Sequence, residues 1–128
     1  MTAKSILIVD DDQLRCELLA ELLEDEGYVV RIAADGEAGL VAAAETLTDL
    51  ILLDIIMPRI DGVRFLQMLP HRIANAPPVI VISGSLDSVG GKTLEELGVR
   101  RKVRKPIDPA DLLEQIEATF AEAAETQA

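Results

Sequence analysis

Aromatic residues and cysteine are scarce in this sequence, and their scarcity limits how the protein is stabilised and where it works. With one Tyr, two Phe and no Trp in 128 residues, the core has to be built from aliphatic side chains. The lone Cys16 has no partner for an internal disulfide, and Met1 leads through a short polar segment directly into a strand, without a signal peptide. We therefore expect a reducing, cytoplasmic location.

Positive charge and long apolar runs are also lacking. Twelve Lys and Arg face 23 Asp and Glu, so the formal net charge is −11, which argues against nucleic acid or an anionic membrane as a partner. No apolar run approaches the roughly 18 residues of a membrane-spanning helix. The length suits one domain, residues 1–128. We expect its folded core over residues 5–120 and a frayed tail or the start of a linker over 121–128.

What the sequence does contain is a series of short apolar runs without alternation. Residues 50–53 are the most continuous, and 6–9 and 79–82 are similar, a pattern typical of parallel strands buried on both faces. Weaker patterns predict a shorter strand over 28–32, near an edge of the sheet, and an unusually basic strand over 99–104. Five strands that alternate with helices predict an α/β fold, a doubly wound five-stranded parallel sheet with right-handed crossovers and helices on both faces.

Amphipathic segments between the strands predict the helices. The first ends at Gly27, and the second opens at Asp35 and runs to about Thr46. Residues 86–98 should form a further helix, but two adjacent glycines weaken its first half by roughly 2 kcal/mol of helix propensity relative to alanine, so we expect a short or mobile element there. Asp108 should cap a last helix, which we expect to fray after Glu122. The predicted apolar stripes are Leu14, Leu18, Leu19, Leu22 and Leu23 in the first helix, Val63, Phe65, Leu66 and Leu69 in the third, and Leu112, Leu113, Ile116 and Phe120 in the last.

Polar side chains stand at the points where the strands end. Asp10 and Asp11 follow the first strand, Asp54 ends the third, Ser83 follows the fourth and Lys105 follows the fifth. Because the carboxyl ends of parallel strands lie at one edge of the sheet, these residues should converge on one cleft. Three neighbouring carboxylates repel one another, and Mg²⁺, which takes carboxylate oxygens and leaves room for phosphate, relieves this repulsion. A hydroxyl and an ammonium group beside a metal-bound carboxylate suit the stabilisation of a phosphoryl group during transfer.

These residues stand in four motifs. The motifs are Ile6-Leu7-Ile8-Val9-Asp10-Asp11-Asp12, Leu52-Leu53-Asp54-Ile55-Ile56-Met57-Pro58-Arg59-Ile60-Asp61-Gly62, Ser83-Gly84 and Lys105-Pro106. In this order and spacing they resemble the receiver domain of two-component response regulators. The resemblance covers residues 5–120 and implies a flavodoxin-like fold with a signalling function in a phosphorelay.

The resemblance also implies how a metal ion is held. Asp11 and Asp54 would ligate Mg²⁺ directly, together with the backbone carbonyl of Ile56, while Asp10 would act through water. Asp12 aligns with a variable third acid of the family, and we interpret it as a helix cap.

The same resemblance implies the chemistry of phosphorylation. Asp54 would be the phosphoacceptor, and the donor would be the phosphohistidine of a sensor histidine kinase or of a histidine phosphotransfer protein. Ser83 would donate a hydrogen bond to a phosphoryl oxygen, and Lys105 would pair with the carboxylate and then with the phosphate. The protein would therefore be a phosphoacceptor and not an enzyme, with self-catalysed phosphotransfer and autodephosphorylation at most.

One position departs from the family pattern and bears on the output. Many receivers carry an aromatic residue on the fifth strand, three residues before the lysine, whereas this chain has Lys102. The resemblance implies output through the face formed by segment 86–98, strand 99–104 and the last helix. Because that strand is basic and that helix is acidic, we predict an electrostatic output. On one account the charges pair within one molecule or are simply solvated, and on the other they match between two molecules in a phosphorylation-dependent homodimer.

Two other functions are compatible with parts of the pattern. A haloacid-dehalogenase-like phosphatase also uses Asp, Mg²⁺, Ser or Thr and Lys, but it needs an Asp-x-Asp nucleophile after the first strand, a late acid pair and a cap domain. A degenerate receiver that acts only as a binding module would lack one of the five site residues, and this chain has all of them. A Rossmann nucleotide-binding domain is excluded, because no Gly-x-Gly-x-x-Gly follows the first strand.

Overall fold

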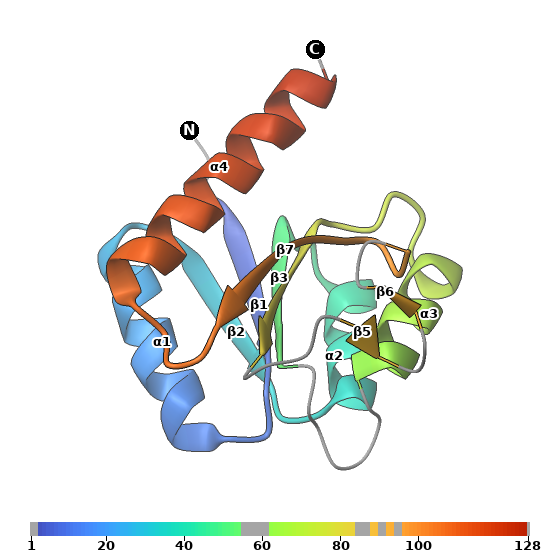
Figure 1. Cartoon of the computed structure of the whole chain (residues 1–128), viewed down its shortest axis with the longest axis horizontal. Helices are drawn as coiled ribbons and strands as arrows, with labels where there is room; N and C mark the ends of the chain where they lie inside the picture. Colours follow the sequence, from blue (N-terminus) through green and yellow to red (C-terminus); the bar gives the residue numbers. More distant parts are fainter. Residues whose placement is uncertain (1–2, 55–61, 84–87, 90–91, 94–95, 128) are drawn as a thin grey trace.

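The computed structural model describes residues 3–54, 62–83, 88–89, 92–93 and 96–127, and strands alternate with helices from residue 5 to residue 83 (Figure 1). The strands are β1 Ser5–Val9, β2 Val29–Ala33, β3 Leu50–Asp54, β4 Val79–Ser83, β5 Ser88–Val89, β6 Lys92–Thr93 and β7 Val99–Arg104. The helices are α1 Gln13–Asp25, α2 Gly36–Glu45, α3 Gly62–Arg72 and α4 Pro109–Gln127.

Five of the strands form one parallel sheet in the order β2-β1-β3-β4-β7. Strand β3 is central, and its register opposes Leu53 to Val9 of β1 and Asp54 to Ile82 of β4. The predicted edge strand 28–32 and the basic strand 99–104 occupy the two edges. The predicted fold class, a doubly wound five-stranded parallel sheet with helices on both faces, is confirmed.

Two apolar layers cover the two faces of the sheet and explain why its inner strands show no alternation. One layer packs α2 and α3 against side chains such as Leu7, Ile51 and Val81, and the other packs α1 and α4 against Ile8 and Leu52. All four of these β1 and β3 residues are at most 1% exposed, as is Val81. In Figure 1, α1 lies to the left of the sheet and α2 and α3 lie to its right. A strand that is buried on both sides has no solvent face for polar residues.

The helix starts follow local capping rules. The side chain of Asp12 accepts a hydrogen bond from the backbone N–H of Arg15, and that of Asp35 accepts one from Ala38, so both residues are N-caps as predicted. At the other end of α1, Gly27 has φ +95°, a backbone conformation that glycine adopts without strain. The caps fix where each helix leaves the sheet edge that carries the polar residues.

The predicted leucine stripe of the first helix is confirmed for Leu19 and Leu23 and wrong for Leu14 and Leu18. Leu14 and Leu18 are 66% and 59% exposed, whereas α1 buries Cys16, Leu19 and Leu23. Leucine occupies two adjacent stripes of this helix, so hydrophobicity alone does not distinguish them. The stripe at Cys16 faces the sheet and leaves Leu14 and Leu18 on the surface.

Two other expectations are corrected. The expected helix over 86–98 does not form in the described part of that segment: β5 and β6 pair antiparallel, and 96–98 is a turn. Gly90 and Gly91, which stand between the two short strands in the sequence, are a pair typical of tight hairpin loops and unfavourable in helices. The last helix does not fray after Glu122, because α4 continues to Gln127 and extends past the sheet at the top of Figure 1.

Candidate functional site

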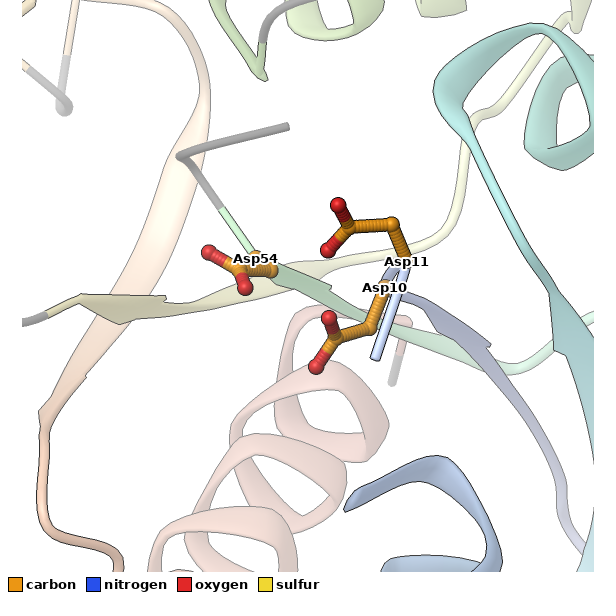
Figure 2. A group of neighbouring side chains, drawn as sticks. All are labelled: Asp10, Asp11 and Asp54. Carbon is orange, nitrogen blue, oxygen red and sulfur yellow. The ribbon is translucent and has the colours of Figure 1, made fainter. Parts of the chain in front are cut away.

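Three carboxylates meet at the carboxyl edge of the sheet, as the strand order requires. Asp10 and Asp11 directly follow β1, and Asp54 is the last residue of β3, the neighbouring strand. One carboxylate oxygen from each of the three lies within 4.8 Å of the others (Figure 2). Asp10 and Asp54 are only 3% exposed, while Asp11 is exposed. The predicted convergence of these acids is therefore seen in the structure.

Lys105 joins the cluster from the edge strand. It follows β7, and its Nζ lies 3.3 Å from Oδ2 of Asp54. The Lys105–Pro106 peptide bond is cis. An ammonium group at this distance from a nearly buried carboxylate offsets part of the cost of removing that carboxylate from water.

Asp10 is held as a carboxylate by its own surroundings. Its Oδ1 accepts a hydrogen bond of 3.0 Å from the backbone N–H of Asp12, and its Oδ2 accepts one of 2.7 Å from Nε of Arg15. Burial by itself would raise the pKa of Asp10, but the hydrogen bonds from Arg15 and Asp12 outweigh it and lower the pKa below its ordinary value. The site therefore presents a negative charge close to Asp54 over the whole neutral range.

Arg15 is the residue of this site that sequence reasoning missed. Arg15 is not part of the predicted apolar stripe of the first helix, yet its Nη2 lies 3.4 Å from Oδ2 of Asp54. The available signal was its spacing: a basic residue on the first turn of a helix, five positions after Asp10, is close enough to fold back onto the acids that precede the helix.

Two other predicted site residues are described only in part or not at all. Ser83 is the last residue of β4, where its backbone stands opposite Arg104 of β7, so it ends its strand at the same edge as the acids. Ile56, the expected carbonyl ligand, lies outside the described residues.

The donor set fits a hard divalent cation. Three carboxylates on one edge supply oxygen ligands, of which Asp11 is open to solvent. Mg²⁺ is bound through one or two carboxylates and keeps several waters, an arrangement that needs this kind of open acidic cluster.

The basic strand β7 is partly neutralised by α4. Arg101 forms an ion pair with Glu122 and donates hydrogen bonds of 3.0 Å to Thr119 and 3.1 Å to Gln115, and Arg100 lies 3.9 Å from Glu122. Of the two accounts of these charges, pairing within one molecule is thus seen for Arg100 and Arg101.

No helix in the part of the chain that the structure describes is long and apolar enough to cross a membrane.

Comparison with known proteins agrees with this geometry. A family model described as the response regulator receiver domain matches residues 6–117. The chain is 32% identical over 113 residues to the DNA-binding response regulator MtrA of Mycolicibacterium smegmatis, an alignment that covers 88% of this chain and 49% of MtrA. It is 40% identical over 116 residues to the transcriptional regulatory protein CpxR of Escherichia coli, with 88% and 47% covered. It spans about half the length of these curated relatives.

Solved structures show the same likeness. The crystal structure of a CheY-like response regulator receiver domain protein from Methanospirillum hungatei superposes with a TM-score of 0.90 and 31% sequence identity, over 98% of this chain and 99% of that one. A likeness of this extent covers the sheet and the helices together.

Proposed function

The chain belongs to the response regulator receiver domains of two-component systems, and on that premise we propose that Asp54 accepts a phosphoryl group from a phosphohistidine. The observation that carries the proposal is the position of Asp54. It ends the central strand, it is 3% exposed, and it lies between the Asp10–Asp11 pair and the ammonium group of Lys105. A nearly buried carboxylate between acids and a cation is expected at a reacting group.

The transfer exchanges one bond for another. A carboxylate oxygen of Asp54 attacks phosphorus, the P–N bond of the phosphohistidine breaks, and the leaving ring nitrogen keeps the electron pair. A proton that the ring takes up from solvent before or as the bond breaks lets the donor histidine leave as neutral imidazole, and Asp54 becomes an acyl phosphate. Lys105, already 3.3 Å from Asp54, offsets negative charge on the phosphoryl oxygens, and we assign the hydroxyl of Ser83 a hydrogen bond to one of them.

We assign Mg²⁺ to the acidic cluster. Asp11 and Asp54 would hold it directly with the carbonyl of Ile56, and Asp10 would hold it through water. When bound, the ion supplies positive charge next to the phosphoryl oxygens, which lowers the barrier of an in-line transfer. The grouping of three carboxylates within 4.8 Å supports this assignment.

A sensor histidine kinase or a histidine phosphotransfer protein is the proposed partner, in the cytoplasm. Its phosphohistidine has to reach Asp54, and the surface beside the site is suited to an apolar partner face. A groove of about 400 Å³ runs next to Lys105 and Leu18, and Leu14 and Leu18 are exposed on the same helix. Exposed leucines next to a reactive group are typical of an interaction surface.

For the output we propose that phosphorylation acts on β7 and its surroundings. Arg100 and Arg101 of β7 already pair with Glu122 of α4 in the same molecule. Phosphorylation of Asp54 would therefore alter the ion pairs that join β7 to α4. A homodimer through this face stays a prediction. Sedimentation with and without beryllofluoride, at low and high salt, tests it: a monomer under all four conditions contradicts the dimer.

Phosphoryl uptake is the direct test of the function. The wild type and Asp54→Asn are treated with acetyl phosphate or a phosphorylated histidine kinase, with and without EDTA, and their intact masses are measured. The wild type should gain one phosphoryl group only when Mg²⁺ is free. Uptake by Asp54→Asn, or undiminished uptake under EDTA, contradicts the assignment, and no uptake by the wild type indicates a binding module.

A further inference from the structure

Arg15 connects the acids of two strands through one side chain. Its Nε and Nη2 donate to Oδ2 and Oδ1 of Asp10 at 2.7 and 3.4 Å, and the same Nη2 lies 3.4 Å from Oδ2 of Asp54 and 3.6 Å from Oδ2 of Asp12. The guanidinium thus binds Asp10 through two of its nitrogens while it reaches across to Asp54. The side chain of Arg15 is itself 28% exposed.

This position gives the acidic cluster two built-in cations. Oδ2 of Asp54 is approached by Arg15 at 3.4 Å and by Lys105 at 3.3 Å. Counted over these described residues, the carboxylates of Asp10, Asp11 and Asp54 carry three negative charges and Arg15 and Lys105 carry two positive charges, which gives a net charge of −1. A cluster with Lys105 alone would keep two unbalanced charges and would attract a divalent cation more strongly.

We propose that Arg15 is a second cationic residue of the phosphoacceptor site, and that it competes with the divalent cation for the carboxylates of Asp10 and Asp54. This inference rests on the proposed function, since it concerns the same metal site. Arg15 stabilises the cluster when no metal ion is bound, and it has to release Asp54 when the ion enters. The consequence is that this receiver needs a higher Mg²⁺ concentration to fill its site than the same three carboxylates would need without Arg15.

The competition is supported by geometry and by charge. A carboxylate oxygen that already accepts hydrogen bonds from two cations has less electron density to offer a metal ion. A guanidinium that remains beside the cluster repels a divalent ion directly, and the low exposure of Asp10 and Asp54 leaves little water to screen that repulsion.

Titration with Mg²⁺ alone, followed by calorimetry, tests the inference on four proteins: the wild type, Arg15→Gln, Arg15→Lys and Arg72→Gln. Arg15→Gln should bind Mg²⁺ about tenfold more tightly than the wild type, because one positive charge near the ion is removed. Arg15→Lys keeps the charge and should stay close to the wild type. Arg72 is exposed at the end of α3. This helix end leads to the start of β4, so Arg72 lies near the amino ends of the strands and not near their carboxyl ends, where the acids meet. Its variant makes the same change in net charge and should leave the affinity unaltered.

Thermal unfolding separates this role from a purely structural one. In EDTA, Arg15→Gln should unfold at a lower temperature than the wild type, because Asp10 and Asp54 lose a counter-ion, and Mg²⁺ should raise the unfolding temperature of the variant by more than that of the wild type. A purely structural role of Arg15 would lower the unfolding temperature of the variant by the same amount in EDTA and in Mg²⁺. In the wild type, the ¹⁵N-resolved Nε–H signal of Arg15 should shift when Mg²⁺ is added, a measurement that needs no variant to fold.

An unchanged or weaker Mg²⁺ affinity in Arg15→Gln, or an Nε–H signal that ignores Mg²⁺, overturns the inference. These outcomes are distinct from a failure of the proposed function. If Asp54 takes up phosphate while Arg15→Gln binds Mg²⁺ like the wild type, only the role of Arg15 is wrong. If the affinity rises as expected but Asp54 takes up no phosphate, the competition stands and the phosphoacceptor function is wrong.

Discussion

Replacing Lys105 with alanine should separate metal binding from the response to phosphate. The Nζ of Lys105 lies 3.3 Å from Oδ2 of Asp54, and Lys105 is not one of the three carboxylate residues that could hold the metal ion. The Lys105→Ala protein should therefore still bind Mg²⁺. Its phosphorylated form, however, lacks the ammonium group that follows β7 and offsets the charge of the phosphoryl group.

The magnitude follows from this distance. Two unit charges about 4 Å apart interact by about 1 kcal/mol in water and by about 4 kcal/mol at an effective dielectric constant near 20. Phosphorylation replaces a single negative charge with about −1.5 to −2. Because phosphorylation adds about 0.5 to 1 unit of negative charge, we expect the loss of Lys105 to destabilise the phosphorylated state relative to the unphosphorylated state by about 0.5–4 kcal/mol, which corresponds to at least about a twofold loss of affinity.

Beryllofluoride, which forms a phosphoryl-like group on the carboxylate, provides the assay. In the wild type it should shift the amide signals of β4 and β7, and in Lys105→Ala these shifts should be weaker and should need a higher concentration. The matched control is Arg72→Ala, which removes one positive charge from the exposed end of α3, away from the acidic cluster and from β7, and should respond like the wild type. Wild-type shifts and affinity in Lys105→Ala would refute the role assigned to this residue.

Three further predictions concern packing and burial. Gly39→Ala places a Cβ 2.8 Å from a methyl group of Val9 and should lower the free energy of unfolding by about 1–3 kcal/mol in urea titrations; a variant as stable as the wild type contradicts the close α2–β1 packing. Asp35→Ala removes the N-cap of α2 and should cost about 1 kcal/mol of stability without changing phosphoryl uptake, and a loss of uptake would argue against a purely structural cap. Burial raises the pKa of the Cys16 thiol to about 11, so iodoacetamide at neutral pH should modify Cys16 far faster in urea than in the folded protein, and equal rates would show that the thiol is accessible.

The sheet and the acidic edge were predictable because both depend on local patterns. Strands buried on both faces contain almost nothing but aliphatic residues, and in a parallel sheet the residues that end the strands meet at one edge. Asp10, Asp54 and Lys105 therefore come together as soon as the strand order is known. Their pairing needs no information beyond the sequence and the handedness of the crossovers.

What the sequence could not supply depends on tertiary choices between similar alternatives. Leucine fills two stripes of α1, and only packing against the sheet selects the one with Cys16 and leaves Leu18 exposed. The inward position of Arg15 follows from the phase of that helix and was missed for the same reason. The segment after β4 carries apolar and acidic residues at helical spacing, but a glycine pair at 90–91 favours the short β5–β6 pairing instead.

Chemical mapping of the phosphorylated residue tests the central claim most directly. Borohydride reduces an aspartyl acyl phosphate to homoserine, so the protein is treated with a phosphodonor and Mg²⁺, reduced, digested and sequenced by mass spectrometry. The account predicts homoserine at position 54 and at no other acid of the edge, including Asp10 and Asp11. Homoserine at either of those positions, or an unmodified Asp54 in a protein that has gained phosphate, would contradict it.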